Sequence, residues 1–162
     1  MDLNEIADLA AVAEFFVVVV SICLIWRQLR QGIQLRKAAN AQALAEHAGQ
    51  FNALLIQDPD VARIWYSYGQ DLASDRFQDL AAAERYQELL VQWLILHENI
   101  YYQHRKGLLD PDLYGSWAAD LEKTIEKHNI RAVAPAIDEV FTGEFGRHLV
   151  HLADRSEALK GA

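Results

Sequence analysis

The residues Leu9–Trp26 read LAAVAEFFVVVVSICLIW, and among them only Glu14 and Ser21 are not apolar. Aromatic and β-branched residues would lie on every side of a helix built from this run, whereas a helix at a protein surface is apolar on one side only. Eighteen helical residues rise about 27 Å, which is close to the hydrocarbon thickness of a bilayer. The run therefore predicts a transmembrane helix over residues 6–26, with a helix buried in a protein core as the alternative.

The charges on either side of this run predict its orientation. Its N-terminal flank is acidic, whereas its C-terminal flank carries basic residues that we expect to meet anionic lipid head groups: Arg27, Arg30, Arg36 and Lys37. Because basic flanks remain on the cytoplasmic side, we expect the N-terminus outside and the C-terminal body in the cytosol. A signal peptide would have basic residues before the apolar run and a small-residue cleavage site after it, and neither is present here. We therefore predict a retained, single-pass anchor in the inner (plasma) membrane.

Small and polar residues follow one another along the run at a spacing of about 3.5 residues, which places them on one helix face: Ala7, Ala11, Glu14 and Ser21. Small residues let membrane helices approach closely, and Ser or Glu side chains can bond across the contact. This stripe predicts an intramembrane contact with a second copy of the chain or with another membrane protein. Chance placement in an alanine-rich helix is one alternative, and a Glu14 that reaches water at the outer interface is another.

The residues that follow the run favour a continuous helix, because no proline interrupts them and strong helix formers predominate. We predict one helix from near Ile6 to near Gln57, in which residues 27–57 form a juxtamembrane basic extension. A break near Gly32 or Asn40 is the alternative. Apolar residues towards the end of this helix form a face that we expect to dock on the body: Leu44, Phe51, Leu54 and Leu55.

Two Asp-Pro pairs mark helix starts, because aspartate can cap a helix and proline suits its first position: Asp58-Pro59 and Asp110-Pro111. The spacing of apolar residues predicts further helices over residues 59–68, 79–106, 111–128, 134–141 and, capped by Thr142, 143–154. We expect residues 155–162 to be a flexible tail. The predicted class is all-α: a transmembrane helix that continues into a long helix, followed by a cytosolic helical bundle over residues 58–154.

Composition excludes several functions. The 162-residue chain has a net charge of −8, which argues against a nucleic-acid partner. Its single cysteine, Cys23, lies in the predicted anchor, so one chain can form neither a disulfide nor a cysteine-based zinc site. The sequence has no phosphate-binding glycine loop and no nucleophile motif. We therefore predict a protein that is not an enzyme, has no cofactor, and has the lipid bilayer as a partner.

Two sets of polar residues are candidate sites. Three residues spaced for one helix face offer weak candidates for metal ligands, Glu144, His148 and His151, but such sets are common by chance and a solvated or partner-facing surface is expected instead. A second set predicts a buried polar network that fixes helix register, with a catalytic acid as the alternative: His97, Glu98, Asn99, Tyr101, Tyr102 and His104. The tryptophans at helical spacing are predicted to be core residues: Trp65, Trp93 and Trp117.

Two segments carry a resemblance to known proteins: DPDVARIWYSYG at Asp58–Gly69 and HENIYYQHRKGLLDPDLY at His97–Tyr114. Together with the anchor and its basic flank, they resemble a widespread group of uncharacterised bacterial proteins that have one N-terminal membrane helix and a small cytosolic helical domain. The resemblance covers roughly Ile6–Trp117. It implies a bacterial membrane protein and assigns no activity or catalytic residue.

These observations predict a membrane-anchored, non-enzymatic helical module for interaction or assembly at the cytoplasmic face of a bacterial inner membrane. One alternative is an oligomeric, membrane-perturbing or channel-like effector with Glu14 as its polar lining. A second alternative is a metal-binding helical protein that uses its histidines and glutamates.

Overall fold

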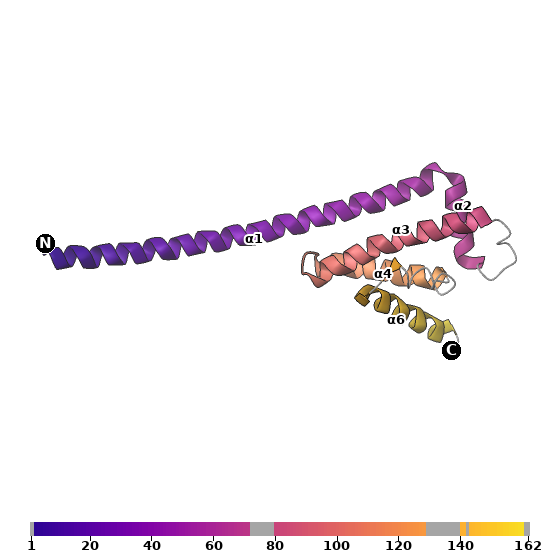
Figure 1. Ribbon diagram of the computed structural model, residues 1–162. Helices are drawn as coiled ribbons and strands as arrows, with labels where there is room; N and C mark the ends of the chain where they lie inside the picture. The colour runs from indigo at the N-terminus through magenta and orange to yellow at the C-terminus, as the bar shows by residue number, and fades with distance from the viewer. Residues whose placement is uncertain (1, 72–79, 129–139, 142, 161–162) are drawn as a thin grey trace. The chain divides into compact units, whose positions relative to one another are not determined.

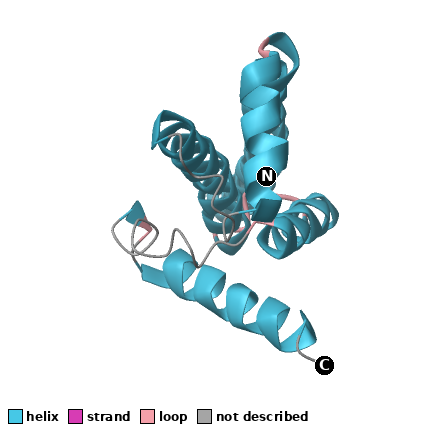
Figure 2. Cartoon of the chain, turned by 90° about the vertical axis from the view of Figure 1, so that its right-hand side faces the viewer, coloured by secondary structure: helices cyan, strands magenta, loops and turns pink. Residues whose placement is uncertain are grey.

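The computed structural model describes residues 2–71, 80–128, 140–141 and 143–160. The helices in this part of the chain are α1 (Leu3–Gln57), α2 (Pro59–Asp71), α3 (Leu80–Arg105), α4 (Pro111–Lys127) and α6 (Gly143–Lys160) (Figure 1). The described residues include no strand (Figure 2), so the all-α prediction is confirmed. The helix predicted over residues 134–141 lies outside the described residues except for its last two positions, and the predicted cap Thr142 lies outside them as well.

The chain forms two compact units, residues 1–39 and residues 40–162. The boundary falls inside α1, so the predicted extension over residues 27–57 is divided between the two. Its C-terminal part belongs to the second unit because Leu44 and Leu55 are buried there. Of the face that was expected to dock, Phe51 is partly buried and Leu54 remains exposed.

In the first unit, every α1 side chain from Val12 to Gln31 is exposed. This helix is long and apolar enough to cross a membrane by length and composition, and none of its apolar window is buried. A core helix would bury these side chains, so the structure does not support that alternative. The backbone of α1 is helical across Gly32 and Asn40, where a break was considered.

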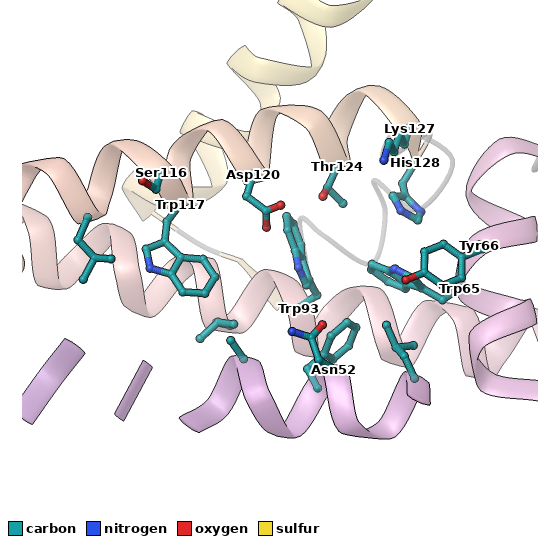
Figure 3. A pocket seen from close by; sticks show the side chains of 15 residues that line it. Asn52, Trp65, Tyr66, Trp93, Ser116, Trp117, Asp120, Thr124, Lys127 and His128 are labelled. Atoms are coloured by element: carbon teal, nitrogen blue, oxygen red, sulfur yellow. The ribbon is translucent and has the colours of Figure 1, made fainter. Parts of the chain in front are cut away.

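The second unit is organised around α3, which packs against α2 and α4, while α4 also packs against α6. Side chains of α3 are almost completely inaccessible to solvent: Tyr86, Leu90, Leu94 and Ile100. Trp65 of α2 and Trp93 of α3 are both buried, as predicted, and their ring centroids lie 6.5 Å apart (Figure 3). Trp117 is only partly buried and packs on a second, smaller core cluster around Leu44.

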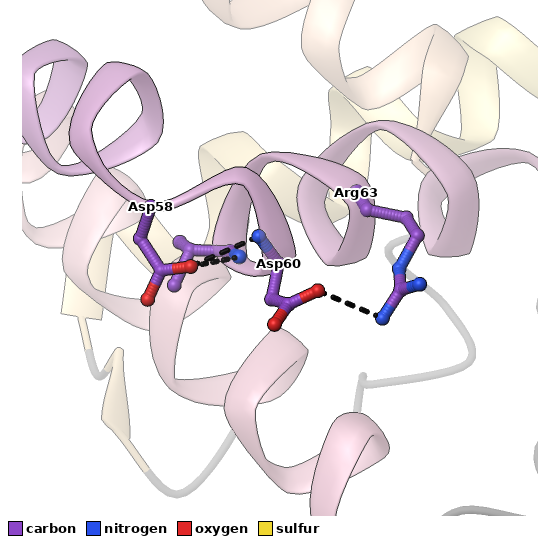
Figure 4. A network of polar contacts seen from close by, with 4 residues as sticks. Asp58, Asp60 and Arg63 are labelled. Carbon is purple, nitrogen blue, oxygen red and sulfur yellow. Dashed lines mark hydrogen bonds and ion pairs between the residues drawn. The ribbon is translucent and has the colours of Figure 1, made fainter.

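Both predicted helix caps are confirmed. At the start of α2, Asp58 Oδ1 accepts hydrogen bonds from the backbone N–H groups of Asp60 at 2.9 Å and Val61 at 3.3 Å (Figure 4). Asp60 also pairs with Arg63 at 3.0 Å. At the start of α4, Asp110 Oδ1 accepts from the N–H of the second helical residue at 3.0 Å. These bonds satisfy N–H groups that a helix N-terminus leaves without partners.

The C-terminal helix is longer than predicted. Residues 155–160, which were expected to be part of a flexible tail, continue α6 to Lys160. Arg155 pairs with Glu122 of α4 at 2.7 Å, and Ser156 is buried, so this last part of α6 packs on the bundle.

The first turn of α6 requires a glycine at position 146, because a Cβ at Gly146 would lie 2.3 Å from the backbone oxygen of Phe141.

Candidate ligand-binding groove

The second unit contains a cavity of about 650 Å³ that is lined by side chains from α1, α2, α3 and α4 (Figure 3). Its apolar lining is largely aromatic: Phe51, Trp65, Tyr66, Trp93 and Trp117. Its polar lining comes mainly from α4: Asn52, Ser116, Asp120, Thr124 and Lys127. We call this cavity the groove. It brings aromatic and polar side chains to one surface in similar measure, although Trp65 and Trp93 are themselves largely buried.

Helix α4 supplies one wall of the groove because it has two different faces. Leu121 and Ile125 are buried against the core. Ser116, Asp120 and Thr124 follow at intervals of four residues, which places them on a common face of the helix, and that face lines the groove (Figure 3). The sequence pattern of α4 therefore directs a row of polar side chains into the groove.

His97 of α3 lies behind the groove, with its ring tilted by 32° to that of Trp93 at a centroid distance of 3.8 Å and nearly perpendicular to that of Trp117 at 5.7 Å. Its Nδ1 lies 3.0 Å from the backbone oxygen of Trp93. A carbonyl oxygen can only accept, so Nδ1 carries the hydrogen and Nε2 of the neutral ring carries none. Burial lowers the pKa of His97, against smaller opposing effects of the Trp93 carbonyl, Asp120 and the Trp117 carbonyl.

Asp120 is the acidic group of the groove. Its Oδ2 lies 3.7 Å from Nε2 of His97, and its side chain is 53% exposed while that of His97 is 2% exposed. Because the neutral His97 presents an unprotonated Nε2, it offers Asp120 no hydrogen-bond donor. Nε2 has no hydrogen-bond partner within the described part of the chain. The carboxylate thus faces the groove without a cationic neighbour on His97.

His128 closes the other end of the groove beside Trp65, with the two ring centroids 4.5 Å apart. Its Nδ1 lies 2.8 Å from the hydroxyl of Tyr86. Burial raises the pKa of Tyr86, so its hydroxyl stays protonated and can donate to Nδ1. Burial, and to a lesser degree Lys127, lowers the pKa of His128 to about 4. Sequence reasoning missed this pair, although His128 continues the apolar stripe of Leu121 and Ile125 at helical spacing.

The predicted polar network of α3 is divided by the structure into separate contacts. His97 faces the groove wall, whereas His104 stacks on Tyr114 with ring centroids 3.7 Å apart. Tyr101 packs edge-to-face on Tyr102 and accepts a hydrogen bond from Arg105 at 3.3 Å. Asn99 is exposed and accepts from Gln103, and burial raises the pKa of the partly buried Glu98. Neighbouring positions on one helix face different directions, so these six residues do not converge.

The three weak candidates for metal ligands have different surroundings and do not form one site. Glu144 pairs with Arg105 at 2.9 Å, His148 stacks on Tyr101 with centroids 5.1 Å apart, and His151 is exposed. Among the described residues, no group of three or more His, Cys, Asp or Glu side chains is placed to hold a metal ion.

The predicted membrane residues lie in the first unit. Glu14 is exposed, and the Ser21 hydroxyl donates to the Val17 carbonyl of its own helix at 2.7 Å. The side chains of Ala7 and Ala11 lie outside the described residues, so the contact stripe stays a prediction. Of the predicted lipid-facing basic residues, three are exposed and Lys37 is half-buried: Arg27, Arg30, Arg36 and Lys37.

Trp26 and Arg30 form a cation–π pair in which the guanidinium carbon lies 3.9 Å from the ring centroid. Tryptophan and arginine are both typical of the boundary between the hydrocarbon and the head groups. The pair lies at the C-terminal end of the apolar run, one turn apart on the same helix face.

Comparisons of the chain with protein-family models, with curated proteins and with solved structures found no match. The resemblance of Asp58–Gly69 and His97–Tyr114 to the bacterial group of membrane proteins therefore stays a prediction.

Proposed function

We propose that this protein is a membrane-anchored, non-enzymatic binding module at the cytoplasmic face of a bacterial inner membrane. In this proposal the N-terminal part of α1 crosses the bilayer, and the body formed by the second unit binds its ligand in the groove. The observation that carries the proposal is the exposure of the apolar α1 side chains between Val12 and Trp26.

The balance of transfer energies favours membrane insertion. Large apolar side chains that are exposed on α1 comprise Val12, Phe15, Phe16, Val17, Val18, Val19, Val20, Ile22, Leu24 and Ile25. On insertion scales each contributes about −0.3 to −0.6 kcal/mol, so together they contribute on the order of −3 to −6 kcal/mol. On the same scales a charged side chain costs about 2.5–3.5 kcal/mol at the centre of a span, and Glu14 costs less because it lies nearer the N-terminal end of the run. The apolar side chains therefore outweigh the single carboxyl group.

The orientation follows from the basic residues after the run. Arg27, Arg30, Arg36 and Lys37 favour the cytoplasmic side, where they would meet anionic lipid. The Trp26–Arg30 pair supports a head-group boundary at this end of the run, because the indole and the guanidinium are both stable there.

The chemistry of the groove favours binding over catalysis. His97 and His128 are buried, and each has one ring nitrogen in a hydrogen bond to Trp93 or Tyr86. Ser116, a hydroxyl in the groove lining, donates to the backbone oxygen of Asp112 at 3.4 Å rather than to a histidine. Within the described groove lining, no hydroxyl forms the hydrogen bond to a base that nucleophilic catalysis requires.

Membrane fractionation tests the proposal. The full chain should sediment with membranes and resist extraction at high pH. Replacing Phe16, Val19 and Ile22 together with lysine should release it, because three lysines cost on the order of 8–10 kcal/mol in the centre of a span. Ile56→Lys is the matched control, since Ile56 is an 82% exposed apolar residue of the same helix in the second unit. A wild-type chain found in the soluble fraction would contradict the anchor.

A further inference from the structure

We infer that the groove binds a small organic ammonium ion with an apolar body, and that the carboxylate of Asp120 holds the charge at the groove surface beside Trp117. This inference rests on the proposed function, in which the groove is the ligand site. It adds the chemical class of the ligand.

The size of the groove suits one small molecule. Its volume of about 650 Å³ lies within the range of roughly 300–1,000 Å³ that is typical of ligand pockets. Its floor and walls carry apolar side chains that can accept a hydrocarbon or ring, among them Phe51, Leu96 and Leu113. An apolar body of this size would replace water on the aromatic surface without requiring a large partner.

The charge of the groove calls for a cation at Asp120. The carboxylate is half-exposed, and the nearest basic group to it within the described part of the chain is the neutral ring of His97, whose Nε2 lies 3.7 Å away. The hydrogen of the neutral His97 ring is on Nδ1, where the Trp93 carbonyl accepts it, so Nε2 has no hydrogen to give. An ammonium group would supply both the charge and the N–H donors that this carboxylate lacks.

The aromatic neighbour that a ligand beside Asp120 can reach also favours a cation. The ring of His97 packs on Trp93 at 3.8 Å, so the partly buried Trp117, which lies one helical turn before Asp120 on α4, is the accessible indole (Figure 3). The faces of indole rings attract cations. An anion beside Asp120 would be repelled by the carboxylate.

Among the described residues of the groove lining, Lys127 is the one lysine or arginine, and it indicates where a ligand ammonium would not lie. It is seven residues from Asp120 on α4, which corresponds to about 10 Å along the helix axis. Lys127 would repel a ligand ammonium at its own end of the groove, beside Trp65, and so favours the end that contains Asp120.

A titration of the full chain in nanodiscs tests this inference. The chain contains four tryptophans, and a Trp26→Phe background leaves fluorescence from Trp65, Trp93 and Trp117 only. The probes are 2-cyclohexylethylammonium, the neutral 2-cyclohexylethanol and the anionic 3-cyclohexylpropionate, which share one apolar body. We expect saturable binding in the order ammonium, alcohol, carboxylate. The ammonium should bind roughly tenfold more tightly than the alcohol, as for one added charge-assisted contact.

Charge variants identify the group responsible. Asp120→Asn should weaken ammonium binding by about tenfold or more and leave alcohol binding unchanged. Asp112→Asn is the matched control, because Asp112 is an exposed carboxylate on α4 outside the groove lining and should have no effect. Lys127→Gln should keep or strengthen ammonium binding. Thermal unfolding of each variant verifies that it is folded, and partition of the amine into the bilayer affects all variants equally.

The outcomes separate this inference from the proposed function. Equal binding of the three probes, or carboxylate binding that is lost in Lys127→Gln, would overturn the ammonium site while keeping a ligand groove. No binding of any probe would overturn both the ammonium site and the groove as a ligand site, whereas the membrane anchor is tested separately by fractionation. Nanodiscs with and without phosphatidylethanolamine distinguish two sources of the ammonium. If this lipid weakens binding of the amine probe, a lipid head group binds at Asp120. If the lipid leaves binding of the probe unchanged, the ligand is a free amine.

Discussion

At the scale of single residues, His97 and His128 are buried histidines that lie between the core of the body and the groove. Each imidazole packs on a tryptophan, Trp93 or Trp65, that also lines the groove. Each has one nitrogen bonded to a neighbour and is kept neutral by burial, because charging a ring in this environment would require desolvating the imidazolium. The stability of the body should therefore depend on pH.

We expect acid to destabilise the body between about pH 6.5 and pH 4. The folded-state pKa of His128 is lowered to about 4, whereas an unfolded histidine titrates near 6.5, so in this range the unfolded chain binds a proton that the folded chain does not. This contribution is complete above pH 6.5 and is lost as the pH falls towards 4. His97 acts in the same direction, since burial lowers its pKa as well.

Denaturant unfolding followed by tryptophan fluorescence in the Trp26→Phe chain measures this effect. Between pH 7 and pH 4.5 the free energy of unfolding should fall by about 2 kcal/mol through His128, after allowance for its partial contact with solvent. His128→Gln should flatten the pH dependence, whereas His151→Gln, at an exposed position, should leave it unchanged. A wild-type chain and His128→Gln variant with the same pH dependence would show that His128 is not the group involved.

At the scale of the helices, the sequence predicted the starts of α2 and α4 correctly but not the end of α6. The starts of α2 and α4 were predictable because Asp58 and Asp110 satisfy backbone groups within their own first turns (Figure 4). The end of α6 was not, because it depends on the pair between Arg155 and Glu122 of another helix. Local signals thus determined one end of a helix, and tertiary contacts determined the other.

The groove was beyond sequence reasoning for a similar reason. Its lining comes from four helices, and no spacing along the chain indicates that Trp65, Trp93 and Trp117 share one cavity. Their burial was predictable from helical periodicity. The significance of Asp120 depends on the distance to His97, which lies 23 positions earlier in the sequence and on another helix.

The proposed membrane helix makes a prediction of its own, concerning Glu14. Ser21 already bonds within its helix at 2.7 Å, so Glu14 is the polar group of the stripe that gains most from a second helix. In a contact between two copies, Glu14 can form a hydrogen bond to the second chain, and glutamine keeps both a donor and an acceptor. In a Cys23→Ser background with Val18→Cys, one turn from Glu14 on the same helix face, Glu14→Gln should therefore preserve cross-linking of two chains, and Glu14→Leu should reduce it.

Glu46→Leu is the control for this cross-linking, because Glu46 is an exposed glutamate of the same helix outside the predicted span. Its replacement should not alter the yield. The same yield from the wild-type, Glu14→Gln and Glu14→Leu chains would mean that Glu14 contacts no second helix, and the stripe would then have no role in assembly.

At the scale of the whole molecule, one helix joins two units with different requirements. The first unit, residues 1–39, exposes its apolar side chains, whereas the second, residues 40–162, has a core of its own. A protein that must be placed at a membrane and also bind a ligand needs these two properties. In the proposed function the second unit binds and the first determines where binding occurs.

Accessibility of Cys23 tests the membrane placement most directly. This thiol is the chain's only cysteine, and it is exposed on the folded chain. Because the thiol is exposed on its own helix, its protection from a reagent in cells would come from the membrane or from a second membrane helix. In spheroplasts, a membrane-impermeant maleimide should leave Cys23 unlabelled until detergent is added. In a Cys23→Ser background, Asp2→Cys should be labelled in intact spheroplasts and Lys123→Cys only after lysis. Labelling of Cys23 without detergent would contradict the anchor, and labelling of Lys123→Cys in intact spheroplasts would contradict the orientation.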